Sequence, residues 1–243
     1  MSVKIVFHPR FYEVYAMDPA AESGRMEAIV SELTDYDFVE AEMANEEDIL
    51  LVHTLAHYEY VKSMQKVYEI AMLAAGGAIK AAKISFNNPA FAAIRPPGHH
   101  ASPDNCWGFC YFNNVAIAVR KLIRDRLIQK AVIVDFDLHF GDGTFNTFKK
   151  DDNVAYHHMK DVEGIDEFLY REDYDIIAVS AGFDRHKQDW GGMLETEDYT
   201  EIGKIIKEYA ESRCDGRRFA VLEGGYNHNV LGKNVRAFIE GFK

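Results

Sequence analysis

The sequence predicts an α/β fold with a central, mostly parallel β-sheet that carries helices on both faces. Short apolar runs of strand length recur along the chain, and segments with helical spacing lie between them. A run without polar alternation is typical of a strand that is buried on both faces, as in a parallel sheet. Strands that alternate with helices favour the same architecture. With 48% hydrophobic residues, the chain can also bury a sizeable core.

Each expected element has its own local signal. The strands are expected where apolar runs are continuous, at residues 3–7, 91–94, 131–134, 176–179 and 219–222. The helices are expected at residues 71–83, 115–127, 197–212 and 229–242. The first helix is rich in small residues and should pack closely on the sheet, and the second is amphipathic. The third follows Thr196, an expected N-cap, and has acidic residues in its first turn.

The 243 residues contain no internal repeat, low-complexity stretch or linker-like run, so we expect one domain over residues 1–243. The net charge of −12 argues against a nucleic-acid partner. It would attract a cationic amine, although acidity that only maintains solubility is the simpler interpretation. No signal peptide or membrane-spanning run is evident, so we expect no membrane partner and a cytoplasmic location. The odd number of cysteines, three, predicts reduced, mostly structural thiols.

Chemistry-bearing residues follow four of the expected strands. The motifs are RPPGHHA, DFDLHFGDG, SAGFD and EGGYNHN, and each begins at or just after the end of an apolar run. Ligands of open parallel sheets bind beyond the carboxyl ends of the strands. We therefore expect these four segments to converge on one site.

The segment DFDLH suggests a metal site. Asp135, Asp137 and His139 are two residues apart, so in extended backbone they point to the same side. Asp137 and His139 together suit zinc, and Asp184 in SAGFD is the best candidate for a third ligand. Three such ligands leave a coordination position open, as in catalytic sites. The alternative is that Asp137 and His139 only form a turn at the strand end.

His99 and His100 follow a stiff Pro-Pro-Gly turn. Hydrolysis of an amide needs a base for water and an acid for the leaving amine, and histidine can do both. Asp135 and Asp142 are the unassigned acids that would orient these rings. The alternative is an exposed histidine pair in a loop.

Two aromatic residues complete the expected site. Tyr226 follows a Gly-Gly pair and would donate to a developing oxyanion, unless it is a packing residue. Phe109 in GFCYFNN would line a channel for an alkyl chain or belong to the core.

In this order, the motifs RPPGHHA, GFCYFNN, DFDLHFGDGT, SAGFD and EGGY resemble the histone deacetylase superfamily, which includes acetylpolyamine amidohydrolases and acetoin-utilisation proteins. The N-terminal segment FHPRFYEVYAMDPAAESGRMEAI is also similar to that family. The resemblance spans nearly the whole chain. It implies an arginase/deacetylase-type fold and a zinc-dependent hydrolase that releases acetate, or another short acyl group, from an acylated amine. It also implies that Asp137, His139 and Asp184 bind Zn²⁺.

The resemblance implies roles for the remaining site residues. His100 would be the general base and acid, oriented by Asp142. His99 would be its electrostatic partner, oriented by Asp135.

By the same resemblance, Tyr226 would polarise the substrate carbonyl, and Phe109 and Gly108 would line the acyl-lysine channel. A K⁺ ion beside the zinc would use Asp135, Asp137 and the backbone of His139.

Two loops depart from the family pattern. The insertion expected between residues 58–65 and the AAGG helix is missing, and the segment after Tyr156 is short. The aromatic partner of Phe109 is therefore unidentified, and we expect a shallow, open pocket. A neighbouring subunit would be one way to complete these loops, so a homo-oligomer is one alternative. The sequence does not decide whether the substrate is acetyl-lysine, an acetylpolyamine or another acylated metabolite.

Two other functions fit the sequence less well. A two-manganese ureohydrolase needs a second acid in a DxHxD array, and Gly141 breaks that pattern. A non-enzymatic protein that binds acetylated amines through a degenerate site is disfavoured, because every polar residue expected for catalysis is present.

Overall fold

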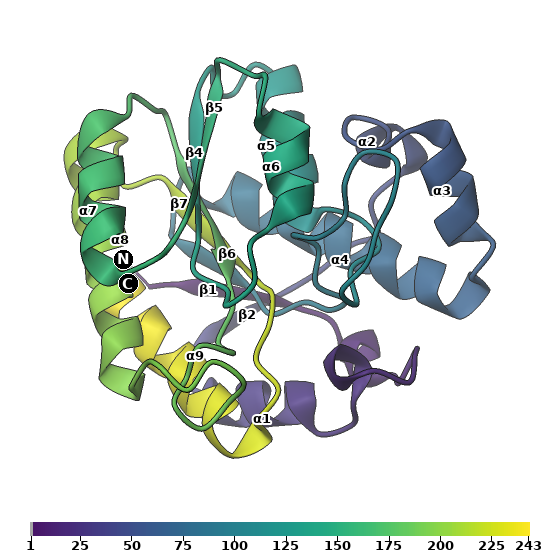
Figure 1. Ribbon diagram of the computed structural model, residues 1–243, viewed down its shortest axis with the longest axis horizontal. Helices are drawn as coiled ribbons and strands as arrows, with labels where there is room; N and C mark the ends of the chain where they lie inside the picture. Colours follow the sequence, from purple (N-terminus) through teal and green to yellow (C-terminus); the bar gives the residue numbers. More distant parts are fainter. Residues whose placement is uncertain (1) are drawn as a thin grey trace.

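The computed structural model describes residues 2–243 and contains one seven-stranded sheet in the order β2-β1-β3-β7-β6-β4-β5 (Figure 1). Every neighbouring pair of strands is parallel. The strands are β1 (Lys4–Phe7), β2 (Asp37–Glu40), β3 (Ala90–Ala92), β4 (Ala131–Asp135), β5 (Val154–His158), β6 (Ile177–Ala181) and β7 (Arg218–Leu222). The predicted α/β class with a parallel sheet is confirmed.

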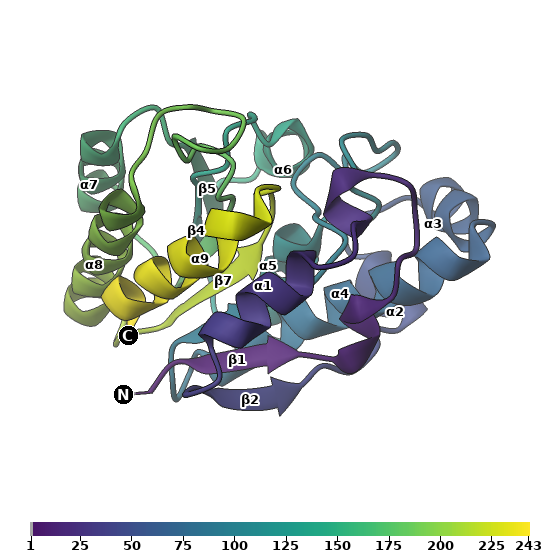
Figure 2. The same ribbon diagram turned by 90° about the horizontal axis from the view of Figure 1, so that it is seen from below.

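Helices cover both faces of this sheet (Figures 1 and 2). Helices α4 and α5 pack on one face, and α1, α8 and α9 lie on the other. The helices are α1 (Arg25–Glu32), α2 (Glu46–Ile49), α3 (Leu55–Lys62), α4 (Gln65–Ile84), α5 (Asn114–Arg124), α6 (Asp142–Phe148), α7 (Val162–Arg171), α8 (Thr196–Arg213) and α9 (His228–Phe242), with short 3-10 turns η1 (Pro9–Tyr12) and η2 (Pro19–Ala21). Among residues 2–243, no helix combines the length and apolar composition needed to cross a bilayer.

All five predicted strands exist, and none of their ends is shifted by more than two residues. The strands β3, β4, β6 and β7 are buried along their whole length, which explains their continuous apolar runs. The prediction missed β2 and β5. These are the edge strands, and they are largely exposed or half-buried, so their sequences lack such a run.

The helix boundaries also need correction. Helix α8 begins at Thr196, and Glu195 takes the N-cap position, where its backbone N–H donates to the Asp198 carboxylate at 2.8 Å. The Thr196 hydroxyl donates instead to Asn234 of α9, also at 2.8 Å. Helix α5 ends at Arg124, before the expected residue 127, because Arg126 adopts a φ of +59° that a helix cannot contain.

Helix α4 begins at Gln65, six residues before the expected start at residue 71. Its first turns bury Val67 and Ile70. They continue the inward-facing stripe beyond the small-residue segment that suggested the helix.

The strand order explains why four distant motifs meet. Strands β3, β7, β6 and β4 are neighbours, so their carboxyl ends form one continuous edge. Residue 135 of β4 is in register with residue 180 of β6. Chain segments that follow these strands therefore emerge side by side, as an open parallel sheet requires.

Candidate active site

Asp137, His139 and Asp184 come together at the ends of β4 and β6. One ligand atom from each lies within 4.8 Å of the other two. The His139 Nδ1 atom is 3.3 Å from Asp137 Oδ1 and 3.1 Å from Asp184 Oδ2. A tetrahedral Zn²⁺ with bonds of about 2.0–2.1 Å keeps its ligand atoms about 3.3 Å apart. This group of residues therefore fits a metal ion.

The charges of this group also favour a cation. Asp137 and Asp184 are 1% and 0% exposed, respectively. Burial and the negative charge of Asp137 raise the pKa of Asp184 to about 6. Gly224 allows this crowding, because a Cβ atom there would come within 2.6 Å of Asp137 and 2.8 Å of Asp184. Two buried carboxylates that repel each other are relieved by a positive ion between them.

His99 is buried and held by a carboxylate. Its Nδ1 atom lies 3.1 Å from Asp135 Oδ2, which also accepts from the Tyr156 hydroxyl at 2.9 Å. Burial lowers the pKa of His99, but the carboxylates of Asp137 and Asp135 outweigh it and raise this pKa well above its usual value. His99 therefore carries a positive charge at neutral pH.

His100 forms the second histidine–carboxylate pair, in which Nδ1 lies 2.7 Å from Asp142 Oδ1. Burial, followed by the positive charge of His99, lowers the pKa of His100 to about 4. The ring is thus neutral at pH 7, and its Nδ1–H donates to Asp142, which leaves Nε2 free to accept a proton. Each histidine is 3% exposed, so this pair is not the exposed loop alternative.

Tyr226 follows β7 and sits among aromatic rings. Its ring stacks on Trp190 at a centroid distance of 4.1 Å and meets Phe109 edge-on at 6.0 Å. The backbone N–H of Tyr226 donates to the Asp189 carboxylate at 2.8 Å. Burial, followed by the negative charge of Asp137, raises the pKa of Tyr226 well above its usual value. Its hydroxyl therefore stays protonated and can donate.

Trp107 covers the outer side of His100. Its indole Nε1–H lies 3.1 and 2.9 Å from the two Asp142 carboxylate oxygens, and its ring centroid is 3.9 Å from that of His100. Gly108 and Phe109 both have a positive φ, of 59° and 65°. A Cβ atom at Gly108 would lie 2.5 Å from the His100 ring, so the turn follows the imidazole closely.

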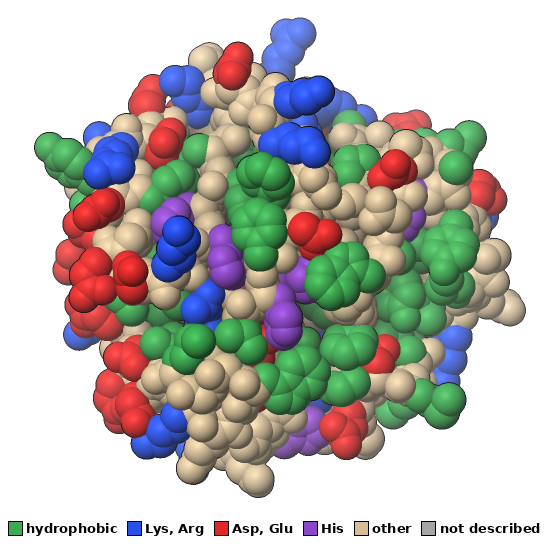
Figure 3. Space-filling view, in the orientation of Figure 1, with side chains coloured by type: hydrophobic (Ala, Val, Ile, Leu, Met, Phe, Trp, Pro, Cys, Tyr) green, Lys and Arg blue, Asp and Glu red, His purple; other side chains and the backbone are tan. Residues whose placement is uncertain are grey.

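The pocket formed by these segments has a volume of about 140 Å³. Figure 3 shows histidine side chains gathered near the middle of one face, with hydrophobic side chains around them. Of the predicted residues, His99, His100, Gly108, Phe109, His139 and Tyr226 line the pocket, together with Pro97, Trp107, Trp190 and Gly224. Phe109 thus lies at the pocket wall, and Trp190 faces it at a centroid distance of 6.5 Å.

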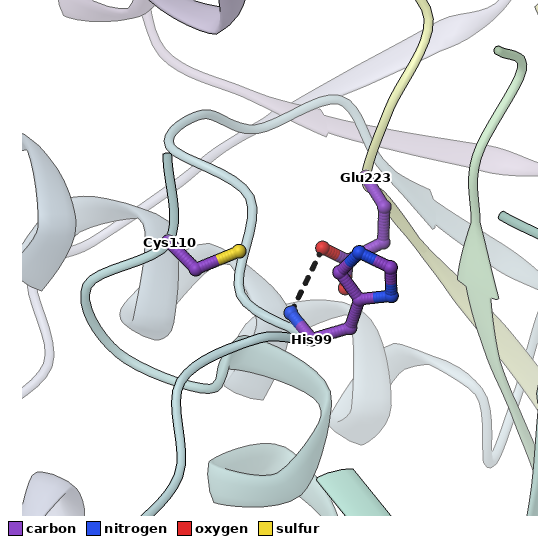
Figure 4. A group of neighbouring side chains, drawn as sticks. All are labelled: His99, Cys110 and Glu223. Carbon is purple, nitrogen blue, oxygen red and sulfur yellow. Dashed lines mark hydrogen bonds between the residues drawn. The ribbon is translucent and has the colours of Figure 1, made fainter. Parts of the chain in front are cut away.

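Glu223 lies next to His99 and fixes the histidine turn through its carboxylate (Figure 4). One of its oxygens accepts from the backbone N–H groups of Gly98 at 2.7 Å and His99 at 3.1 Å, and the other accepts from Ser180 at 3.2 Å. Burial raises the pKa of Glu223 to about 7, and the positive charge of His99 opposes that rise. Glu223 and Cys110 lie within metal-ligand distance of His99. The carboxylate is already engaged by three protein donors, so we assign this group a structural role.

The comparisons with known proteins agree with this geometry. The model of the histone deacetylase domain matches residues 19–163 and 163–242, which is most of the chain. The chain belongs to the histone deacetylase family.

Three relatives illustrate this membership of the histone deacetylase family. The probable deacetylase of Methanothermobacter thermautotrophicus is 31% identical over an alignment that covers 98% of this chain and 90% of the relative. That of Archaeoglobus fulgidus is 34% identical over 90% of this chain and 77% of the relative. The crystal structure of the HD domain of HDA15 has a TM-score of 0.83 over 99% of this chain and 89% of that chain, at 22% identity, and shows the shared fold.

Three contributors to this histone deacetylase-family site were not singled out in the sequence. Glu223 directly follows a buried strand, so the strand-end argument could have found it. Trp107 precedes the GFCYFNN motif but has no local signal of its own. Trp190 reaches Phe109 from the loop after β6, whereas the sequence pattern predicts this wall in the segment after Tyr156.

Proposed function

We propose that this protein is a zinc-dependent deacetylase that hydrolyses the N-acetyl, or another short acyl, amide of a lysine side chain, a polyamine or a related amine. The observation that carries this proposal is the convergence of Asp137, His139 and Asp184 beside the His100–Asp142 pair. The names of the archaeal relatives, probable deacetylases, favour the same reaction.

The donor set suits zinc. Two carboxylates and one imidazole are ligands that Zn²⁺ accepts, and three protein ligands leave a position for substrate or water. When bound, Zn²⁺ would polarise the amide carbonyl and activate water at neutral pH. Zinc is thus the ion that the reaction requires, with Asp137, His139 and Asp184 as its ligands.

The protein's own groups supply the proton transfers. His100 Nε2 accepts a proton from the attacking water as the new C–O bond forms, while Asp142 holds the ring through Nδ1. The Tyr226 hydroxyl donates to the oxygen on which negative charge develops, and the charged His99 stabilises it electrostatically. His100 then donates the proton to the amine nitrogen as the C–N bond breaks. Acetate and the free amine are the products.

The pocket walls favour an acylated alkyl amine as substrate. Phe109 and Trp190 present ring faces and edges to a small space, so they suit a methylene chain that leads to the acyl group. The net charge of −12 would attract the cationic remainder of a polyamine or a lysine-rich tail.

The ureohydrolase alternative lacks its second acid. Gly141 stands where that chemistry needs a carboxylate, and a Cβ atom there would lie 2.4 Å from Asp135 Oδ2. The site therefore has no room for a second bridging carboxylate at this position.

The test is a panel of acetylated and longer-chain acylated amines, including acetyl-lysine peptides and acetylpolyamines. The metal-free protein is assayed alone, with added zinc and with a chelator. We expect release of acetate and free amine that depends on zinc and stops with the chelator. The degenerate binding protein would instead bind these amides without releasing acetate, and that result would exclude the proposed activity.

A further inference from the structure

Arg185 is a buried charge directly after the metal-site residue Asp184. Its exposed fraction is 5%. Among residues 2–243, its guanidinium forms no salt bridge with a carboxylate. Burying an unpaired charge costs on the order of several kcal/mol of folding free energy. Arginine cannot avoid this cost by losing its proton, because it stays protonated in proteins. The charge of Arg185 must therefore be stabilised by something else.

Backbone carbonyl groups provide that stabilisation. The Nε–H group donates to the carbonyl oxygens of Phe136 at 3.1 Å and Asp137 at 3.0 Å. One Nη2–H group donates to the carbonyl of Met159. These oxygens belong to residues just beyond the ends of β4 and β5, on the segment that carries the metal-site residues and on its neighbour. A cage of backbone carbonyl oxygens is the kind of ligand set that binds K⁺ in proteins.

Two backbone carbonyl groups at the implied potassium site, those of Asp135 and Asp137, already accept hydrogen bonds. Family resemblance implies K⁺ bound through Asp135, Asp137 and the His139 backbone. The Asp137 carbonyl accepts from Arg185 and from His158 Nε2, both at 3.0 Å, which occupies its two lone pairs. The Asp135 carbonyl accepts from the Met159 backbone N–H at 2.8 Å. These residues do not fit the implied K⁺ ion.

We propose that the Arg185 guanidinium replaces a monovalent cation beside the metal site. It gathers the carbonyl groups that follow β4 and β5 and so holds Asp137 in position to bind the metal. The inference uses only the metal-binding part of the proposed function.

The first test compares salts. Zinc affinity, by competition with a chromophoric chelator, and the unfolding temperature are measured for the wild-type protein. The solutions contain potassium, sodium or tetramethylammonium chloride at equal ionic strength. We expect the same values in all three salts, because the cation is part of the chain. A specific increase in either quantity with K⁺ would overturn the proposal.

The second test removes the guanidinium. Arg185→Met should weaken zinc binding about 10- to 100-fold, the usual effect of losing a group that orients metal ligands. Arg185→Lys keeps the charge and should lose less. Arg213→Met is the matched control, because Arg213 also donates to two backbone carbonyls, those of Leu169 and Tyr170, away from the site. Wild-type zinc affinity in Arg185→Met would refute the role of Arg185.

The third test is chemical rescue, in which K⁺ or low-millimolar guanidinium is added to Arg185→Ala. We expect either cation to strengthen its zinc binding and to leave the wild type unchanged. If neither cation changes zinc binding by Arg185→Ala, the carbonyl groups are not a cation site and the proposal is wrong. If Arg185→Met and Arg185→Ala do not fold, the zinc affinity of Arg185→Lys and the comparison of salts still test the proposal.

These readouts do not depend on catalysis. A protein that binds zinc but releases no acetate from any acylated amine would refute the deacetylase proposal and leave the result on Arg185 intact.

Discussion

Tyr226 shows how neighbouring groups set the state of a single residue. Burial and the nearby Asp137 carboxylate keep its phenol protonated, and Trp190 and Phe109 hold its ring. The same reasoning separates the two histidines. Three carboxylates near His99, those of Asp135, Asp137 and Glu223, raise its pKa, whereas burial lowers that of His100. Identical side chains thus acquire different protonation states in adjacent positions.

We expect Tyr226→Phe to lower kcat by about 100- to 1,000-fold, the typical effect of losing one donor to an oxyanion. The fold should be unaffected because the ring and its packing remain. Steady-state kinetics and thermal unfolding measure the two effects. Tyr170→Phe is the control, since Tyr170 is 70% exposed. Turnover close to wild type would remove Tyr226 from the mechanism.

Asp137→Ala should abolish stoichiometric zinc binding, because it removes one of three ligands and also the carboxylate that accepts from the Gly224 and His139 backbone N–H groups. Elemental analysis of the purified variant measures the metal content. Asp173→Ala removes a carboxylate with an 88% exposed side chain and serves as the control. One zinc per chain in Asp137→Ala would show that the ligand set is wrong.

At the scale of secondary-structure elements, parallel strands and a tight turn position the side chains of the site. The ends of four neighbouring strands carry the motifs to one edge of the sheet. The turn at residues 107–110 then folds over His100, with two consecutive residues at positive φ. For Phe109, which is not a glycine, this conformation is strained and must be held by the surrounding contacts.

This turn predicts a measurable role for Trp107. Trp107→Phe keeps a ring over His100 but removes the N–H that donates to Asp142. Because hydrogen bonds to charged groups are among the stronger ones, we expect kcat to fall about tenfold with little change in KM. Trp190→Phe is the matched control and should act mainly on KM, since Trp190 is a wall of the pocket. An unchanged kcat in Trp107→Phe would contradict this role.

At the scale of the whole molecule, buried polar groups join loops that are distant in the sequence. His53 is one of them, with an exposed fraction of 3%. Its Nδ1–H donates to the Ser102 carbonyl at 3.0 Å, and its Nε2 accepts from the Asn113 N–H at 2.9 Å. Both bonds need the neutral ring. Burial, followed by the proximity of His57, lowers the pKa of His53 from 6.5 to about 3.

This low pKa predicts a pH-dependent stability. Between pH 6.5 and about 3, the unfolded chain binds a proton at His53 and the folded chain does not. The stability from the neutral ring is therefore complete above pH 6.5 and is lost as the pH falls, by at most about 1.4 kcal/mol per pH unit. Denaturant unfolding of the wild type and His53→Gln at several pH values measures this slope. Parallel pH profiles for the two proteins would contradict the assignment.

Several features of the fold and the site could be predicted from the sequence because their causes are local. A strand buried on both faces needs a continuous apolar run, and this property revealed all five strands that were predicted. The edge strands β2 and β5 lacked that signal because almost all of their residues are exposed or half-buried. The histidine and carboxylate candidates followed from the rule that parallel strands end at a shared edge.

Other features depended on contacts between distant segments. The wall opposite Phe109 is Trp190, 81 positions later in the sequence. Asp137 is one of the residues that we expect to bind K⁺, and its carbonyl accepts a hydrogen bond from Arg185, which looks like an ordinary charged residue in the sequence. Apolar periodicity and motif order were sufficient for the fold class and the family, and they named the three residues, Asp137, His139 and Asp184, that the structure brings together. The folded structure was needed to identify the pocket walls and the partner of each buried charge. Packing and electrostatics act between residues that are far apart in the sequence.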